Sequence, residues 1–298
     1  MNLEFERGAT AEAHNTPGGL PSIPLVHLND GNAIPQLGFG VWQVGNDEVV
    51  KVVATAIEAG YRSIDTAEGY DNEQGVGRAI REASVDRDEL FIASKLRTKL
   101  LGEKEAVEGV KGSLKALGLD YLDMFLIHWP APAHDRYVAA WQGLIRAREE
   151  GLVKSIGVSN FLPEHLERII WETGVKPVVN QIETHPEFQQ RDIRDILKRH
   201  DIRQESYSPL GSGAALDNPV IARIAEAHGK SPAQVIIRWH LQEWLIVIPK
   251  SVHEDRIREN LEVFDFELSD TEMAAIAKLD RTPDGRTGSD PSTFNDLW

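Results

Sequence analysis

Short apolar runs alternate with longer amphipathic stretches along most of the chain. The apolar runs predict eight strands, which start at Leu37, Tyr61, Leu90, Tyr121, Val153, Pro177, Ile202 and Leu245. The amphipathic stretches predict helices over residues 47–59, 72–83, 103–117, 135–150, 163–172, 191–199, 218–228, 232–242 and 254–264. Eight parallel strands with helices between them close into a barrel. We therefore predict an α/β fold, a single-domain (β/α)8 TIM barrel.

Two shorter apolar runs precede the first repeat. They flank Asn29, Asp30 and Gly31 in PLVHLNDGNAIPQLG, which is typical of a hairpin. We expect this β-hairpin to close the bottom of the barrel. Residues 1–22 are rich in Ala, Thr, Gly, Pro and charge without periodicity, so we expect a disordered extension there and the barrel domain over 23–298.

The main alternative fold is an open doubly wound sheet. That fold is marked by G-x-G-x-x-G after its first strand. Three similar stretches, GFGVWQ at Gly38, GVGRAI at Gly75 and GSGAAL at Gly211, each lack the third glycine. No P-loop, HExxH pair or GxSxG elbow occurs either, so the motifs favour the barrel.

Composition limits the partners more than the fold. The 298 residues are 41% apolar and 27% charged, with a formal net charge of -15 at pH 7, which disfavours nucleic acid and anionic membranes. The absence of cysteine excludes disulfides and thiolate metal sites, and no segment resembles a signal peptide or a membrane span. We expect a cytoplasmic monomer that acts on a small molecule, without nucleic acid, membrane or metal.

Polar side chains stand at the ends of the predicted strands. Asp65, Lys95 and His128 are spaced by about 30 residues, roughly one strand–helix–strand repeat each. Barrel enzymes carry their functional groups where the strands end, so these side chains should share one rim. The later strands end in Ser159 with Asn160, Gln181, Tyr207 with Ser208, and Lys250 with Ser251.

Tyr70 follows Asp65 on the returning loop, which suggests a proton-donating site. Lys95 would stabilise the tyrosinate and lower the phenol pKa toward the working range, while Asp65 would fix Lys95 and keep it charged. Tyr70 could then protonate a carbonyl oxygen to which His128 donates a second hydrogen bond. Such a reaction also needs a hydride, which no amino acid supplies, so a nicotinamide cofactor is implied.

Each of these four residues also has an ordinary structural interpretation. Asp65 could cap the next helix, and Lys95 could be a solvated lysine at a strand end. His128 could be a hydrogen-bonded core histidine, and Tyr70 a surface tyrosine. Four such roles on one rim would be a coincidence, so we interpret the residues as one site.

The stretch IPKSVHEDRIREN, after the last predicted strand, indicates a phosphate site. Lys250 and Ser251 leave the strand, and a helix that begins near Glu254 carries Arg256. Two cations and a helix N-terminus suit a phosphate monoester. The alternative is ordinary charge at a helix start, with Arg256 paired to Glu259.

The sequence resembles the aldo-keto reductases. The resemblance covers residue 22 to the end of the chain, and its motifs agree in order, spacing and side chains. It is closest to the short-looped bacterial enzymes typified by 2,5-diketo-D-gluconate reductase. The motifs that carry it are GYRSIDTAEGYDNEQGVG, LFIASKL, LDMFLIHWP, SIGVSNF, VNQIETHP, ESYSPLG and IPKSVHEDRIREN.

The resemblance implies a barrel that binds NADPH in an extended pose, with NADH as a weaker cofactor. It implies Tyr70 as the acid of a tetrad completed by Asp65, Lys95 and His128. The implied cofactor contacts are Ser159, Asn160 and Gln181 at the carboxamide, Tyr207 on the nicotinamide ring, Ser208, Leu210 and Ser212 along the pyrophosphate, Lys250, Ser251, Val252 and Arg256 at the 2'-phosphate, and Glu259 with Asn260 at the adenine.

The resemblance also implies a substrate pocket, where the chain departs from the family. Trp42, Trp129 and His128 would line the pocket, although the tryptophans could instead be barrel-end packing. Arg97 stands where the family usually has tryptophan. We hypothesise that Arg97 pairs with a carboxylate or other polar group on the substrate; the alternative is a salt bridge to a neighbouring loop.

Two further stretches bear on the pocket and the cofactor. The final GSDPSTFNDLW would form a small lid, with Phe294 and Trp298 as its large apolar contacts. His253 stands where close bacterial relatives often carry arginine beside the phosphate site. We therefore expect a weaker preference for NADPH over NADH than in those relatives.

We predict an NADPH-dependent oxidoreductase that reduces aldehydes and ketones, among them keto-sugar acids or other polar carbonyls. One alternative is an aldolase with a Schiff base on Lys95, which Asp65 disfavours by keeping that amine charged. The other is a regulatory protein of the same fold that binds the cofactor without significant turnover.

Overall fold

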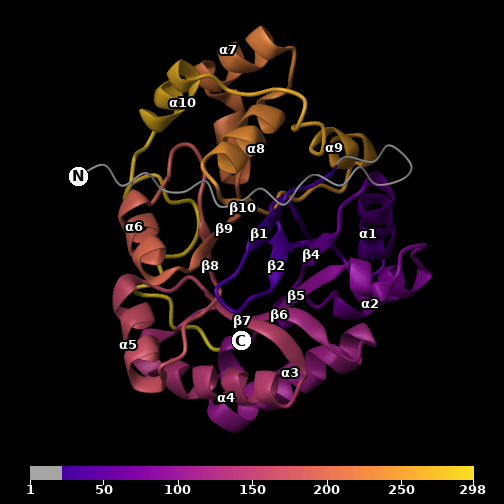
Figure 1. The fold of residues 1–298 in the computed structure, drawn as a ribbon, viewed down its shortest axis with the longest axis vertical. Helices are drawn as coiled ribbons and strands as arrows, with labels where there is room; N and C mark the ends of the chain where they lie inside the picture. The colour runs from indigo at the N-terminus through magenta and orange to yellow at the C-terminus, as the bar shows by residue number, and fades with distance from the viewer. Residues whose placement is uncertain (1–21) are drawn as a thin grey trace.

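The computed structural model describes residues 22–298, and its centre is a closed parallel barrel (Figure 1). Hydrogen bonds close the sheet between its first and last strands, because Leu37 bridges Val247 and the amide of Gly40 donates to Pro249 O at 3.1 Å. The predicted (β/α)8 barrel is confirmed. Its strands, adjacent in chain order, are β3 (Phe39–Gly40), β4 (Ser63–Asp65), β5 (Phe91–Leu96), β6 (Leu122–Ile127), β7 (Val153–Ser159), β8 (Val179–Glu183), β9 (Arg203–Tyr207) and β10 (Ile246–Val247).

Helices surround the barrel and cover the outer faces of its strands (Figure 1). The prediction of 254–264 as helix is wrong in length, since that helix ends at Glu259, and the helix over 270–277 was not predicted. The other predicted helices are confirmed within two residues at each end. The helices are α1 (Glu48–Ala59), α2 (Glu73–Glu82), α3 (Glu103–Leu117), α4 (Tyr137–Glu149), α5 (Pro163–Thr173), α6 (Arg191–His200), α7 (Pro219–His228), α8 (Pro232–Gln242), α9 (Glu254–Glu259) and α10 (Asp270–Ala277).

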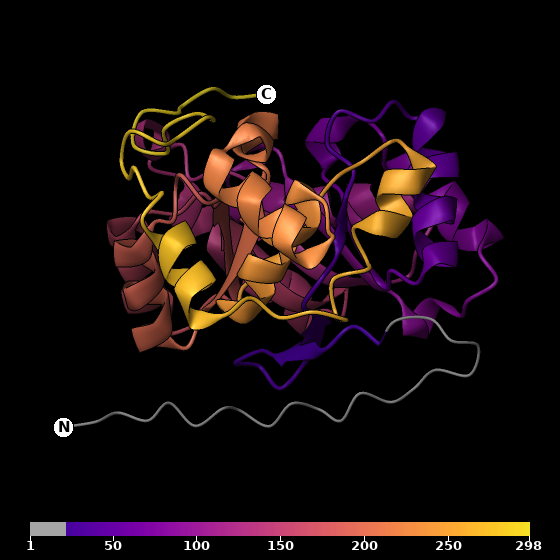
Figure 2. The ribbon, with the colours of Figure 1, turned by 90° about the horizontal axis from the view of Figure 1, so that it is seen from above.

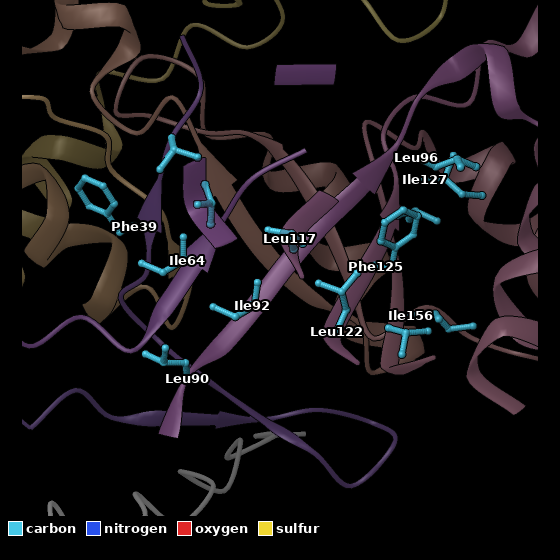
Figure 3. Packing of buried hydrophobic residues seen from close by; sticks show 14 of the residues in the cluster. Phe39, Ile64, Leu90, Ile92, Leu96, Leu117, Leu122, Phe125, Ile127 and Ile156 are labelled. Carbon is cyan, nitrogen blue, oxygen red and sulfur yellow. The ribbon is translucent and has the colours of Figure 1, made fainter. Parts of the chain in front are cut away.

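The alternation of side chains along the strands divides the core in two. Ile64, Ile92 and Phe125 belong to the larger cluster, which lies between the strands and the helices (Figure 3). Phe91 and Ala93 belong to a second cluster with residues of the hairpin and the other strands. Because alternate residues of a strand face the same way, Lys95 continues the second series toward the C-terminal end of the barrel.

The predicted hairpin closes the end of the barrel where the strands begin. Its strands are β1 (Leu25–His27) and β2 (Ala33–Pro35), paired antiparallel. Between them, the Asn29 side chain donates at 2.9 Å to the carbonyls of Pro177 and Asp201, which precede β8 and β9. Figure 2 shows the hairpin and the final segment of the chain at opposite ends of the barrel. Residues 1–21 of the predicted extension lie outside the described residues.

Among residues 22–298, no helix combines the length and the apolar composition that crossing a bilayer requires.

Candidate active site

Four side chains from the ends of three neighbouring strands meet at the C-terminal rim. Lys95 Nζ lies 2.5 Å from Asp65 Oδ2 and 3.3 Å from Tyr70 Oη, and the Lys95 side chain is fully buried. The ring of His128 stands edge-on to that of Tyr70, with 5.7 Å between the ring centroids. The structure thus brings together all four residues that the sequence singled out.

The positions of these residues in the barrel strands explain why their side chains lie close together. Asp65 ends β4, Lys95 lies near the end of β5, and His128 follows β6. Both oxygens of Asp65 are taken by side-chain donors of the barrel interior, so the alternative that Asp65 caps the next helix is wrong. The four groups are positioned as one cluster by three neighbouring strands.

The loop after β4 returns Tyr70 to this cluster. It forms a short 3-10 turn over Glu68–Tyr70. Beyond the turn, the buried side chain of Asn72 donates at 3.0 Å to the carbonyls of Val41 and Val44 and accepts from Thr66 Oγ1. The loop is therefore tied to the barrel on the far side of Tyr70.

Burial and charge set the protonation of the cluster. Burial raises the pKa of Tyr70 above its ordinary value; Lys95 lowers it, as expected, but by less, so the predicted net decrease is wrong. Burial alone would lower the pKa of Lys95, but Asp65 and Tyr70 reverse this and raise it. Burial and the charge of Lys95 both lower the pKa of His128. At neutral pH the cluster thus holds a phenol, an ammonium and a neutral imidazole.

Glu205 is a buried carboxyl beside this cluster that the sequence analysis missed. It lies in β9 and is 1% exposed. Gln181 Nε2 joins it to the cluster, lying 2.9 Å from Glu205 Oε2 and 2.8 Å from Asp65 Oδ1. Burial and Asp65 raise the pKa of Glu205 to about 8, against the smaller opposing effects of Gln181 and Lys95. A charged residue inside a predicted strand was the signal that could have found it.

A cavity of about 720 Å³ opens above the four residues. Both predicted pocket tryptophans, Trp42 and Trp129, line it, and Trp42 is 52% exposed. Asp65, Tyr70 and His128 contribute to the floor, whereas Lys95 lies beneath it. The predicted cofactor residues that line this cavity are Ser159, Asn160, Gln181, Tyr207, Ser208, Leu210, Ser212 and Lys250.

A second cavity of about 400 Å³ adjoins the first and shares Leu210 and Lys250 with it. Among residues 22–298, neither Lys250 nor Arg256 forms an ion pair. The alternative that Arg256 merely pairs with Glu259 is therefore wrong. The remaining predicted cofactor residues, Ser251, Val252, Arg256, Glu259 and Asn260, all line this cavity, as does His253.

Hydrogen bonds order the polar wall of the first cavity. Asn160 donates to His128 O at 3.0 Å and to Ser159 Oγ at 3.1 Å, and it accepts from the Tyr207 hydroxyl at 2.7 Å. Ser159 Oγ in turn donates to Gln181 O at 2.8 Å. These side chains hold one another in place, and Tyr207 forms part of the cavity wall.

The final segment of the chain, for which a small lid was predicted, contributes Phe294 and Trp298 to the lining of the cavity. The ring of Trp298 stands edge-on to His128 at 5.2 Å, and the ring of Phe294 lies 4.3 Å from that of Trp129. Earlier in the same segment, the backbone amides of Thr287 and Gly288 donate to the Glu183 carboxylate at 2.7 and 2.9 Å.

Arg97 lies outside both cavities. Its guanidinium donates to Glu68 O at 2.7 Å and pairs with Asp71 and with the Glu68 carboxylate. The structure therefore shows the salt bridge to a neighbouring loop that was the alternative to a substrate contact.

The structure is thus a barrel in which a buried lysine contacts a tyrosine at the floor of a two-part cavity. A model of the aldo/keto reductase family matches residues 36–281. The chain is 52% identical over 272 residues to methylglyoxal reductase DkgA of Escherichia coli (strain K12), covering 91% of this chain and 98% of that protein. It is 49% identical to an aldo-keto reductase of Mycolicibacterium smegmatis, with the same coverage.

Solved structures agree with these relatives. A crystal structure of a Gox0644 mutant in complex with NADPH is 48% identical, with a TM-score of 0.88 over 91% of this chain and 98% of that one. The Bombyx mori aldo-keto reductase in complex with NADP is 37% identical, with a TM-score of 0.82 over 87% and 93%. The chain belongs to the aldo/keto reductase family.

Proposed function

We propose that this protein reduces small aldehydes and ketones with NADPH, and that Tyr70 is the general acid. The observation that carries the proposal is the 3.3 Å separation of Lys95 Nζ from Tyr70 Oη, at the floor of two adjoining cavities of about 720 and 400 Å³. The similarity to a methylglyoxal reductase and to an NADPH complex supports the reaction and the cofactor.

The cluster provides the proton and stabilises the charge that its transfer leaves. Tyr70, protonated at neutral pH, donates to the carbonyl oxygen, and the ammonium of Lys95 stabilises the tyrosinate. Asp65 holds that ammonium in place. His128, as a neutral imidazole, orients the carbonyl through a hydrogen bond. A bound nicotinamide supplies the hydride.

The two cavities fit NADPH. Lys250 and Arg256 face the second cavity and have no carboxylate partner in the described part of the chain, so they are available to bind a 2'-phosphate. Gln181 spends both amide hydrogens on Asp65 and Glu205, which leaves its oxygen to accept from a carboxamide. We propose that Tyr207 stacks on the nicotinamide and that Ser208, Leu210 and Ser212 lie along the pyrophosphate.

The substrate end of the cavity favours small carbonyls without charge. Its walls are aromatic, formed by Trp42, Trp129, Phe294 and Trp298. Lys250 is the one Lys or Arg among its lining residues within the described part of the chain. A 2-oxoaldehyde of the methylglyoxal type fits such a site better than a keto-sugar acid does.

The two alternatives fare differently. An aldolase would need an uncharged Lys95, whereas Asp65 raises the pKa of that amine. The charge of Lys95 does not argue against a regulatory protein that binds the cofactor without turnover. That alternative is tested by measuring turnover.

The decisive experiment is steady-state NADPH oxidation with a panel of charged and uncharged carbonyls. We expect turnover by the wild type, and a kcat lower by roughly 10²–10⁴-fold in Tyr70→Phe with an unchanged Kd for NADPH. Tyr137→Phe, a tyrosine outside both cavities, is the matched control. Near-normal kcat in Tyr70→Phe rules out the assigned acid, and absence of wild-type turnover with tight NADPH binding supports the regulatory alternative.

We further propose a cytoplasmic monomer in which residues 23–298 form one domain. The large apolar side chains on the surface of the described residues are few, among them Leu25, Trp171 and Trp244. Light scattering of the purified protein tests the monomer: a dimer mass at micromolar concentration contradicts it.

A further inference from the structure

Arg97 contacts the turn that carries Tyr70 both before and after that residue. Its Nη2 donates to Glu68 O, two residues before Tyr70, and to the carboxylate of Asp71, the residue after it. The Glu68 carboxylate lies 3.6 Å from Arg97 Nε, and it also accepts from the Arg97 amide at 3.4 Å. The guanidinium and the turn thus hold each other through several contacts.

Ring contacts, such as that of Tyr70 with His128, pack this turn, but among the described residues its ion pairs come from Arg97 alone. The turn is three residues long, contains Gly69, and ends at Asp71 in the left-handed conformation, with φ of 54°. Within the described residues, Tyr70 Oη is hydrogen-bonded to the protein only by Lys95, at 3.3 Å. A shift of the turn would therefore change that separation directly.

The arginine and the ammonium belong to one rigid segment. Lys95 lies near the end of β5, which is buried throughout, and Arg97 follows that strand directly. A tie from Arg97 to the turn therefore fixes the turn relative to Lys95. The Arg97 side chain is 18% exposed, so its contacts are partly shielded from solvent.

We propose that Arg97 is a positioning residue that holds the turn of Tyr70 against β5 and so sets the distance from Tyr70 Oη to Lys95 Nζ. The proposal rests on the assignment of Tyr70 as the acid. It gives Arg97 a role in the proton-transfer step and none in binding the charge of a substrate.

Substitution of Arg97 should lower kcat and leave binding nearly unchanged. A misplacement of about 1 Å can cost about 10²-fold, so we expect kcat to fall roughly 10–100-fold in Arg97→Met. KM and the Kd for NADPH should change less than about threefold. The loss should be equal for carbonyls with and without a carboxylate. Arg97→Lys should recover only part of kcat, because one ammonium cannot replace a planar fork of donors.

A variant of Asp71 tests the same contact if the Arg97 variants misfold. Asp71 is 79% exposed, so Asp71→Asn should fold normally and should lower kcat in the same way, though less. In the double variant the two losses should not add, because both variants break one contact. Arg78→Met is the matched control, since Arg78 pairs with Asp47 on the surface of α1 and α2, away from the turn.

Hydrogen–deuterium exchange tests the tie without any activity. We expect faster exchange at residues 67–72 in Arg97→Met and Asp71→Asn than in the wild type and Arg78→Met. Unchanged exchange together with unchanged kcat overturns the proposal, and so does a loss confined to carboxylate-bearing substrates, which would assign Arg97 to the substrate. If the wild type reduces no carbonyl, the proposed function fails, while the exchange data still decide whether Arg97 holds the turn.

Discussion

Asp65 and Glu205 accept the two hydrogens of a single amide, that of Gln181, inside the barrel. One carboxyl is charge-balanced by Lys95 at 2.5 Å, whereas the other, Glu205, has no cation in contact among residues 22–298. Glu205 can therefore stay buried at neutral pH only by keeping its proton.

Glu205 should make the protein less stable as the pH rises. Its pKa is raised to about 8 in the folded state, so the folded protein holds this proton more tightly than the unfolded one. Stability should then fall from about pH 4.5 through about pH 8. We expect Glu205→Gln to remove roughly 1–3 kcal/mol of this decline, measured by urea unfolding at several pH values. Glu167→Gln, on the exposed surface, is the control; equal pH profiles for wild type and Glu205→Gln contradict the prediction.

Removing the Lys95 ammonium alone should be costly. Lys95→Met leaves the carboxylate of Asp65 buried without a cation, which typically costs about 3–5 kcal/mol. The double variant Lys95→Met with Asp65→Asn should recover most of the stability and none of the turnover. Thermal unfolding measures the stability of the single and double variants, and NADPH oxidation measures their turnover. Recovery of activity in the double variant would show that Tyr70 does not need the ammonium.

Arg256 should distinguish NADPH from NADH. Loss of a charged hydrogen bond costs about 1.5–3 kcal/mol, so kcat/KM for NADPH should fall roughly 10–100-fold in Arg256→Ala, with little change for NADH. Arg258→Ala is a close control, because Arg258 pairs with Glu254 at 3.0 Å and lies outside the second cavity. An equal fall in kcat/KM with NADPH and NADH would show that this site does not bind the 2'-phosphate.

Gly69 should be needed for Trp298 to reach His128. A Cβ on Gly69 would lie 2.0 Å from Trp298 Cζ3, so Gly69→Ala must move the ring. We expect KM for small carbonyls to rise several-fold, with a change in tryptophan fluorescence. Gly112→Ala, where a Cβ meets no atom within 4 Å, is the control. An unchanged KM would mean that Trp298 does not contribute to substrate binding.

The barrel and the gathering of the four rim residues could be predicted because both depend on local periodicity and on strand order. Helix α10 was missed because Ile276 is its only buried residue, which leaves no apolar stripe to detect. Helix α9 was overestimated, because apolar residues after Glu259 continue the helical spacing without forming a helix.

The electrostatic details needed the structure. The upward shift of the Tyr70 pKa depends on how deeply the phenol is buried, which sequence spacing does not reveal. The partners of Arg97 lie 26 and 29 residues away along the chain, on a loop whose conformation no pattern specifies. From its position in the sequence, Arg97 could contact the substrate or form a salt bridge to a neighbouring loop, and only the structure shows that it pairs with Glu68 and Asp71 of the turn.

The hairpin that closes the strand-start end has a practical consequence for handling this protein. An affinity tag or fusion partner joined ahead of Pro24 would start on the side of β1 and β2, and the final segment of the chain lies at the opposite end of the barrel (Figure 2). The same addition after Trp298 is attached directly beside His128. Immobilisation through a tag joined ahead of Pro24 should therefore leave the cavity accessible to substrate and cofactor. Immobilisation through a tag after Trp298 should obstruct the cavity.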